Sequence, residues 1–288
     1  MTARKPAPTA RLRRLAAELR RLRREAGLTR DEVAERTGIN AATLYRIETA
    51  RVRPQPRTLA SLLAAYEVDE PERNGLTALL KAARQRSWLH TLASELPERY
   101  ASYIEFESEA TELFTYQSLH IPGLLQTPDY ARAVTRGSLP EVADDDIERR
   151  IEARIKRQAV LAGDRPLRLW AIIDEAALRR PVGGPDVMRT QLDHLRTTAE
   201  SPSITLQVIP FDAGAHPGLV GSFTLMRFPE HVGPEAVYIE SQAGDVFLEE
   251  EEDIARYRVV FEHLRAVALS PAASIAATHR HTPERGAQ

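Results

Sequence analysis

Residues that could support acid–base, metal or phosphate chemistry occur in this chain, but not at the spacings that known catalytic motifs require. The eight histidines include no i, i+4 pair with an intervening glutamate, the pattern of a helical zinc protease. Neither a glycine-rich phosphate loop nor a Gly-x-Ser-x-Gly nucleophile elbow is present. The absence of cysteine excludes disulfides, thiolate metal sites and a cysteine nucleophile. We therefore expect no catalytic residue, no metal and no cofactor.

The carboxylates of Asp174 and Glu175 are the most catalytic-looking pair, because they follow a predicted buried strand at residues 167–173. Carboxylates also suit the positive N-terminal end of a helix, and we favour this interpretation. The tripeptide His-Pro-Gly at residues 216–218 could form a ligand loop. The candidate ligand or partner residues in this half of the chain are His216, Tyr238 and Glu240.

Residues 29–48 carry the most informative pattern in the sequence. Thr29 followed by Glu32 forms a capping box, Gly38 suits a left-handed turn, and Asn40 is a helix N-cap. Apolar side chains stand where two steeply crossing helices must meet, at Val33, Ala34, Ile39, Leu44 and Ile47. These features predict a helix-turn-helix, whose second helix enters the DNA major groove.

The elements around this motif predict two domains. We expect a flexible arm at residues 1–8 and an all-α five-helix DNA-binding domain at residues 9–86, with a connecting helical segment at residues 87–104. A C-terminal α+β domain with a mixed sheet flanked by helices is expected at residues 105–270, and a tail at residues 271–288. The extended segments at residues 110–121 and 236–240 are predicted to be sheet edges, open to strand addition by a small partner.

Charge is divided unevenly along the 288 residues. The first 60 residues hold 15 basic and 6 acidic side chains, a net charge of +9, whereas the remaining 228 carry a net charge of −11. This asymmetry favours a basic module for a polyanion joined to an acidic body. No apolar run approaches the roughly 18 residues that a membrane span needs. We expect a cytoplasmic protein without a membrane partner.

Residues 12–68 resemble the Xre/phage-repressor family of five-helix DNA-binding domains. The resemblance includes the pattern Glu-x-x-Arg-x-x-Pro at residues 48–54, after the second helix of the motif. It implies a structural ion pair between Arg23 and Glu48. It places base readout at Ala41, Ala42, Tyr45 and Arg46, and Arg46 can bond guanine O6 and N7 bidentately. It places contacts to the DNA backbone at Arg30, Asn40, Thr43, Arg51 and Arg53.

The second half resembles the C-terminal domain of actinomycete Scr-type antitoxin-like regulators. The segments that carry this resemblance are residues 121–127, 130–133, 172–179, 182–184, 191–195, 207–210, 221–225 and 237–240. The resemblance implies transcriptional control, often beside a gene for a small companion protein, and assigns no chemistry to the domain.

Taken together, these patterns predict a sequence-specific transcriptional regulator. We expect a homodimer on an inverted-repeat operator of double-stranded DNA, with the C-terminal domain mediating dimerisation and sensing a partner or a small-molecule effector. An antitoxin-like protein that holds a small companion protein, and binds DNA for autoregulation, is the alternative. A DNA-tethered enzyme is the second alternative. A short adjacent reading frame would favour the antitoxin-like alternative over the regulator.

Overall fold

The structure is a computed structural model that describes residues 10–82, 98–229, 235–241 and 244–283. Within these residues the chain forms two compact units, which divide between Phe106 and Glu107. Helix α7 (Glu98–Glu109) runs through this division. The arm expected at residues 1–8, and the connecting segment up to residue 97, lie outside the described residues.

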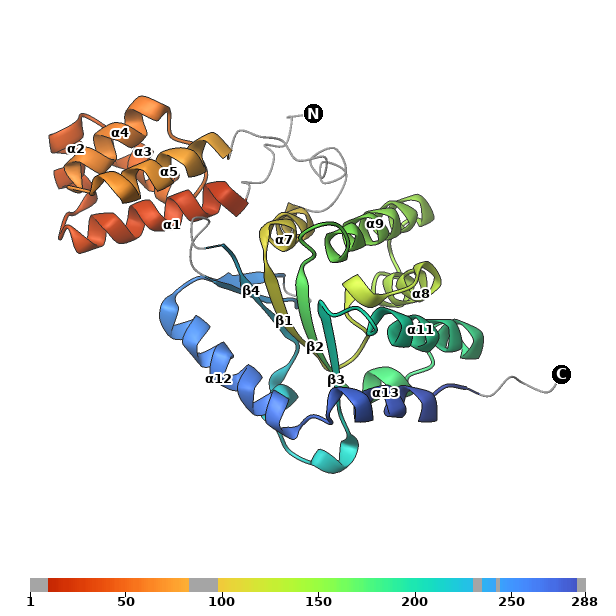
Figure 1. The fold of residues 1–288 in the computed structure, drawn as a ribbon. Helices are drawn as coiled ribbons and strands as arrows, with labels where there is room; N and C mark the ends of the chain where they lie inside the picture. Colours follow the sequence, from red (N-terminus) through yellow and green to blue (C-terminus); the bar gives the residue numbers. More distant parts are fainter. Residues whose placement is uncertain (1–9, 83–97, 230–234, 242–243, 284–288) are drawn as a thin grey trace. The chain divides into compact units, whose positions relative to one another are not determined.

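The first unit contains a bundle of five helices (Figure 1). They are α1 (Ala10–Glu25), α2 (Arg30–Thr37), α3 (Ala41–Glu48), α4 (Pro56–Ala65) and α5 (Glu70–Ala82). Apolar side chains bury one side of each helix against the others. The most deeply buried are Leu15, Leu19, Val33, Leu44, Ile47, Leu59, Leu62 and Leu63, each at most 1% exposed. The predicted all-α five-helix domain is therefore confirmed.

The second unit is built on one six-stranded mixed sheet with the order β3-β2-β1-β4-β5-β6. The strands are β1 (Glu112–Gln117), β2 (Arg168–Asp174), β3 (Ile204–Ile209), β4 (Phe223–Arg227), β5 (Ala236–Ile239) and β6 (Val246–Leu248). Strands β1, β2 and β3 are parallel, and β4, β5 and β6 add in antiparallel fashion. This arrangement confirms the predicted α+β class with a mixed sheet.

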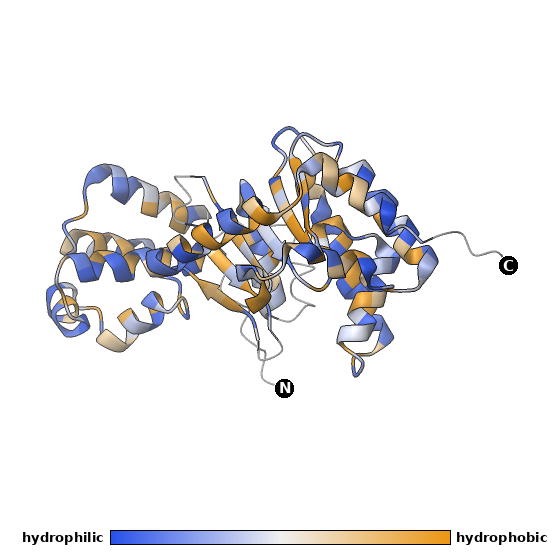
Figure 2. Cartoon of the chain, turned by 90° about the horizontal axis from the view of Figure 1, so that it is seen from below, coloured by the Kyte–Doolittle hydropathy of each residue, from blue (hydrophilic) through white to orange (hydrophobic). Residues whose placement is uncertain are grey.

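Helices cover both faces of the sheet (Figure 1). The connections between the parallel strands contain α8 (Pro128–Ser138), α9 (Asp144–Arg157), α10 (Glu175–Arg179) and α11 (Pro185–Thr198). On the opposite face, α12 (Glu251–Val267) packs Ile254, Phe261 and Leu264 against the apolar side chains of the strands. Figure 2 shows hydrophobic residues along the strands, and most of the apolar side chains of β1 to β5 are buried.

Short 3-10 turns complete the connections of the second unit. They are η1 (Gly123–Leu125), η2 (Gln158–Leu161), η3 (Phe211–Ala213) and η4 (Pro217–Val220). The last two lie in the loop between β3 and β4, and η3 begins two residues after the last residue of β3.

The predicted sheet edges at residues 110–121 and 236–240 are wrong. Strand β1 lies between β2 and β4, and β5 lies between β4 and β6. Each therefore has a hydrogen-bonded neighbour on both sides and cannot accept an added strand. The terminal strands of the sheet are β3 and β6.

The segment at residues 271–288, expected to be a tail, begins with helix α13 (Pro271–Arg280), which packs against β3. The Ser274 hydroxyl accepts a hydrogen bond from the backbone N–H of Val208 at 2.9 Å, and Ser274 is fully buried. Ser270 caps the helix by accepting from the N–H of Ala273. A serine facing the edge of β3 satisfies a backbone donor that the sheet itself leaves unpaired.

Candidate nucleic-acid interface

Local capping residues define the start of α2, the turn at its end and the start of α3. The Thr29 hydroxyl accepts from the N–H of Glu32, and the Glu32 carboxylate accepts from the N–H of Thr29 at 2.7 Å, so the capping box is complete. Gly38 ends α2 at φ 70°, a left-handed conformation that glycine adopts without strain. The side-chain oxygen of Asn40 accepts from the N–H of Ala42 at 2.8 Å and begins α3.

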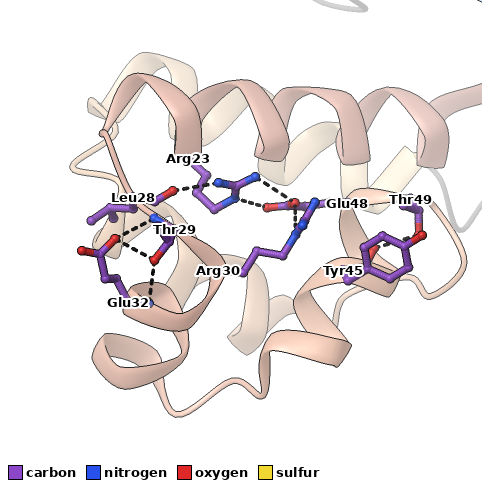
Figure 3. A network of polar contacts seen from close by, with 8 residues as sticks. All are labelled: Arg23, Leu28, Thr29, Arg30, Glu32, Tyr45, Glu48 and Thr49. Atoms are coloured by element: carbon purple, nitrogen blue, oxygen red, sulfur yellow. Dashed lines mark hydrogen bonds and ion pairs between the residues drawn. The ribbon is translucent and has the colours of Figure 1, made fainter.

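A buried ion pair joins α1 to α3 (Figure 3). Arg23 Nε donates to Glu48 Oε1 at 2.6 Å, and a second guanidinium nitrogen donates to Glu48 Oε2 at 3.2 Å. The remaining terminal nitrogen of Arg23 donates to the carbonyl of Leu28 at 2.7 Å. The Glu48 side chain is fully buried, so removing it would leave the Arg23 guanidinium without its carboxylate partner in the interior.

Arg30 joins α2 to the same carboxylate. Its Nε donates to Glu48 Oε2 at 2.8 Å, and its guanidinium carbon lies 5.2 Å from the centroid of the Tyr45 ring (Figure 3). The guanidinium carbon of Arg51 lies 5.7 Å from the same centroid. Both distances are within the range of a cation–π interaction. Neither contact of Arg30 was expected from the sequence, because the resemblance to the Xre family placed this residue against the DNA backbone.

The outer face of α3 presents the predicted base-reading residues. Ala42, Tyr45 and Arg46 are exposed, and Tyr45 is 42% exposed, whereas Leu44 and Ile47 face the core. Arg46 donates to the hydroxyl of its neighbour Thr43 at 3.1 Å. An arginine and a tyrosine on one exposed helix face can bond base edges in a major groove.

The other predicted DNA-contacting residues surround this face. Ala41 and Thr43 are half-buried on α3, Asn40 is exposed at its N-terminus, and Arg51 and Arg53 are exposed in the loop that follows. The oxygen of Asn40 is occupied by the helix cap, so only its amide NH2 remains to meet a phosphate. These residues lie on one helix and its flanking turns, and none is buried.

The candidate ligand residues of the second unit do not form one site. His216 is almost fully buried, and its Nε2 lies 3.7 Å from Asp174 Oδ2, while Nδ1 has no hydrogen-bond partner among the described residues. Tyr238 is buried within β5, where its ring packs against Phe247. Glu240 is exposed beyond the end of β5. Within the described residues, no contact joins His216 to the other two.

Asp174 and Glu175 are both engaged by neighbouring residues. Asp174 accepts from the N–H of Ala176 at 2.8 Å and caps α10. Glu175 accepts from the N–H of Phe211 at 2.8 Å and forms an ion pair with Arg179, and its Oε1 lies 3.0 Å from His281 Nε2. Burial opposes ionisation of Glu175, but the bonds from Phe211 and Arg179 outweigh it and hold the pKa of this carboxyl below its ordinary value.

A buried amide network accounts for the segment at residues 121–127. Gln126 donates to the carbonyl of Ile121 at 2.7 Å and accepts from Arg154 at 2.7 Å. Gln191 of α11 accepts from the N–H of Thr127 at 2.7 Å and donates to the carbonyl of Leu125 at 2.6 Å. Both glutamines are fully buried. Their amides satisfy the backbone groups of an irregular segment, which is a structural task.

Among the described residues, no group of three or more histidine or acidic side chains is placed to hold a metal ion. No single described helix is long and apolar enough to cross a membrane, and only the pair α12 and α13, bent by 66°, meets that criterion jointly by length and composition.

Comparison with known protein families agrees with the two units. Residues 14–76 match the family described as a helix-turn-helix domain, and this match supports a DNA-binding regulator. Residues 100–280 match a domain of unknown function, DUF5753. Because this match extends over more than half of the chain, the protein belongs to the DUF5753 family. Searches of curated proteins and of solved structures gave no match.

Proposed function

We propose that this protein is a sequence-specific transcriptional regulator of the Xre type that binds double-stranded DNA through α3. The observation that carries this proposal is the exposed face of α3, which presents Tyr45 and Arg46. The buried Arg23–Glu48 pair holds this helix against α1. Arg46 reads a guanine, Tyr45 contacts an adjacent base pair, and the methyl groups of Ala41 and Ala42 contact thymine. Asn40, Thr43, Arg51 and Arg53 bond flanking phosphates.

The DNA-binding species is a homodimer on an inverted repeat. One small helix-turn-helix domain buries too little surface on DNA for tight specific binding, and two such domains related by a twofold axis double it. The second unit supplies the dimer contact and receives a small companion protein or a small-molecule effector. A bound companion or effector would act by shifting the spacing of the two DNA-binding units. We also propose that this second unit is not catalytic.

Selection of binding sites from a random DNA library, with the full chain as bait, tests this function. We expect an enriched inverted repeat whose half-site centres lie about 10 base pairs, or a multiple of that, apart. Binding to a duplex with one half-site scrambled should weaken at least about tenfold, because only one domain can then read bases. Enrichment of no sequence, or equal binding to the scrambled duplex, would count against the proposal.

A further inference from the structure

Arg30, on the first turn of α2, connects two residues of α3. It bonds the buried Glu48 carboxylate through Nε at 2.8 Å, and its guanidinium lies over the exposed ring of Tyr45. Tyr45 and Glu48 are three residues apart and therefore lie on the same side of α3. One side chain of α2 thus sets the position of an α3 ring relative to the interior carboxylate.

The contacts of Arg30 make a move toward a phosphate costly. Its side chain is 37% exposed, and leaving Glu48 would break a charge-assisted hydrogen bond to a side chain that is fully buried. Arg23 would then be the sole described guanidinium bonded to that carboxylate. The Tyr45 ring would also lose one of its two cations.

Arg51 also contacts the Tyr45 ring, but unlike Arg30 it is not bonded to Glu48. It is exposed, its guanidinium carbon lies 5.7 Å from the ring centroid, and none of the described carboxylates pairs with it. Moving Arg51 to a phosphate would therefore leave no buried charge behind. The two arginines are alike in charge and in their contact with Tyr45, and they differ in their bond to Glu48.

We propose that Arg30 is a positioning residue for Tyr45 and not a phosphate contact, and that Arg51 is the phosphate contact of the pair. This inference rests on the proposed DNA-binding function. Arg30 bonded to Glu48 restricts the Tyr45 ring to one orientation before DNA arrives. A side chain ordered in advance loses less conformational entropy on binding and meets the same base pair each time.

The test uses the full chain and the duplex enriched by site selection. The base pair read by Tyr45 is first identified as the one at which Tyr45→Ala relaxes the sequence preference. Arg30→Met should then reduce the preference at that base pair about five- to tenfold. The slope of log affinity against log salt concentration should stay unchanged in Arg30→Met, whereas Arg51→Met should reduce its magnitude by about 0.9, the value for one phosphate contact.

Two further variants separate positioning from charge. Arg30→Lys keeps the cation beside Glu48 but lacks the planar, Nε-donating guanidinium, so it should lose the preference as Arg30→Met does. In the Tyr45→Ala background, Arg30→Met should have no further effect on preference, because the residue that it positions is gone. Circular dichroism of each variant checks that the helical unit is folded.

The inference is overturned if Arg30→Met lowers the salt slope by about 0.9 and leaves the preference unchanged. Wild-type preference in Arg30→Lys, or a Tyr45→Ala variant with unchanged preference at every base pair, would overturn it as well. Failure of the wild-type chain to enrich any sequence would instead count against the proposed function.

Discussion

Glu48 shows how a single residue can serve both the stability and the use of a DNA-binding surface. Its buried carboxylate accepts from Arg23 on α1 and from Arg30 on α2. The two guanidiniums neutralise a charge that would otherwise be costly to bury. The same bonds hold three helices together under the exposed face that carries Tyr45 and Arg46.

In the second unit, Glu175 is a carboxylate whose ionised form stabilises the fold. Its pKa is held below the ordinary value in the folded chain, so it contributes stability above its unfolded pKa near 4.5. That contribution is lost as the pH falls through the lower, folded-state pKa. Glu175→Gln should therefore lower the free energy of unfolding by about 1–3 kcal/mol at pH 7, because bonds to a charged acceptor are weakened.

Denaturant unfolding of Glu175→Gln at several pH values checks this expectation. The difference from the wild-type chain should shrink as the pH falls below 4.5, where the wild-type carboxyl also becomes protonated. Glu252→Gln is the matched control, because the Glu252 side chain is 91% exposed and its loss should change stability little. A Glu175→Gln effect that is constant from pH 7 to pH 3 would contradict the assigned role of the charge.

At the scale of elements, the turn between α2 and α3 sets how the recognition face is presented. Gly38 has φ 70°, and a Cβ built there would meet no atom within 4 Å. Gly38→Ala should therefore lower the stability of the helical unit by about 1–2 kcal/mol through backbone strain alone, without a steric clash.

Gly75→Ala is the matched control for this substitution. Gly75 lies inside α5 without a positive φ, and a Cβ there also meets open space. Alanine at this helical position should raise stability by about 0.5–1 kcal/mol. Thermal unfolding followed by far-ultraviolet circular dichroism would measure both changes. Equal effects of the two substitutions would mean that the left-handed turn at Gly38 does not limit stability.

The helical unit could be predicted from the sequence because its determinants are local. Thr29 with Glu32, Gly38 and Asn40 each act within four residues of their partners. The strand order of the sheet could not be predicted in this way. Whether β1 is an edge or a central strand depends on its pairing with β4, whose residues are more than 100 positions away in the chain. A strand's own alternation contains no information about its neighbours.

The candidate DNA-binding face was likewise predictable where it depends on local sequence, and not where it depends on contacts between helices. Exposure of Tyr45 and Arg46 follows from helical periodicity, and the structure places both on the outer face of α3. The bond between Arg30 and Glu48 crosses from one helix to another, 18 positions apart. Only the packing of α2 on α3 decides whether Arg30 faces the interior carboxylate or solvent. The burial of His216 beside Asp174 likewise depends on the loop between β3 and β4.

At the scale of the whole molecule, the distribution of charge and the helix-turn-helix match both favour DNA binding by the first unit. The net charge of +9 in the first 60 residues favours a polyanion, and the net charge of −11 in the remainder opposes indiscriminate DNA binding. The helix-turn-helix match, at residues 14–76, lies mostly in the basic part, and the DUF5753 match lies in the acidic part. Affinity for a specific site should therefore depend on a few well-placed contacts from α3.

The affinity of Arg46→Ala for the selected operator at moderate salt tests the central claim most directly. We expect a loss of about 1–3 kcal/mol relative to the wild-type chain, together with relaxed preference at one base pair, because a bidentate contact to guanine is removed. Arg24→Ala, which removes the same charge from an exposed position of α1, should bind within about threefold of wild type. If Arg46→Ala binds the operator as tightly as the wild-type chain, α3 does not read DNA through the face described here.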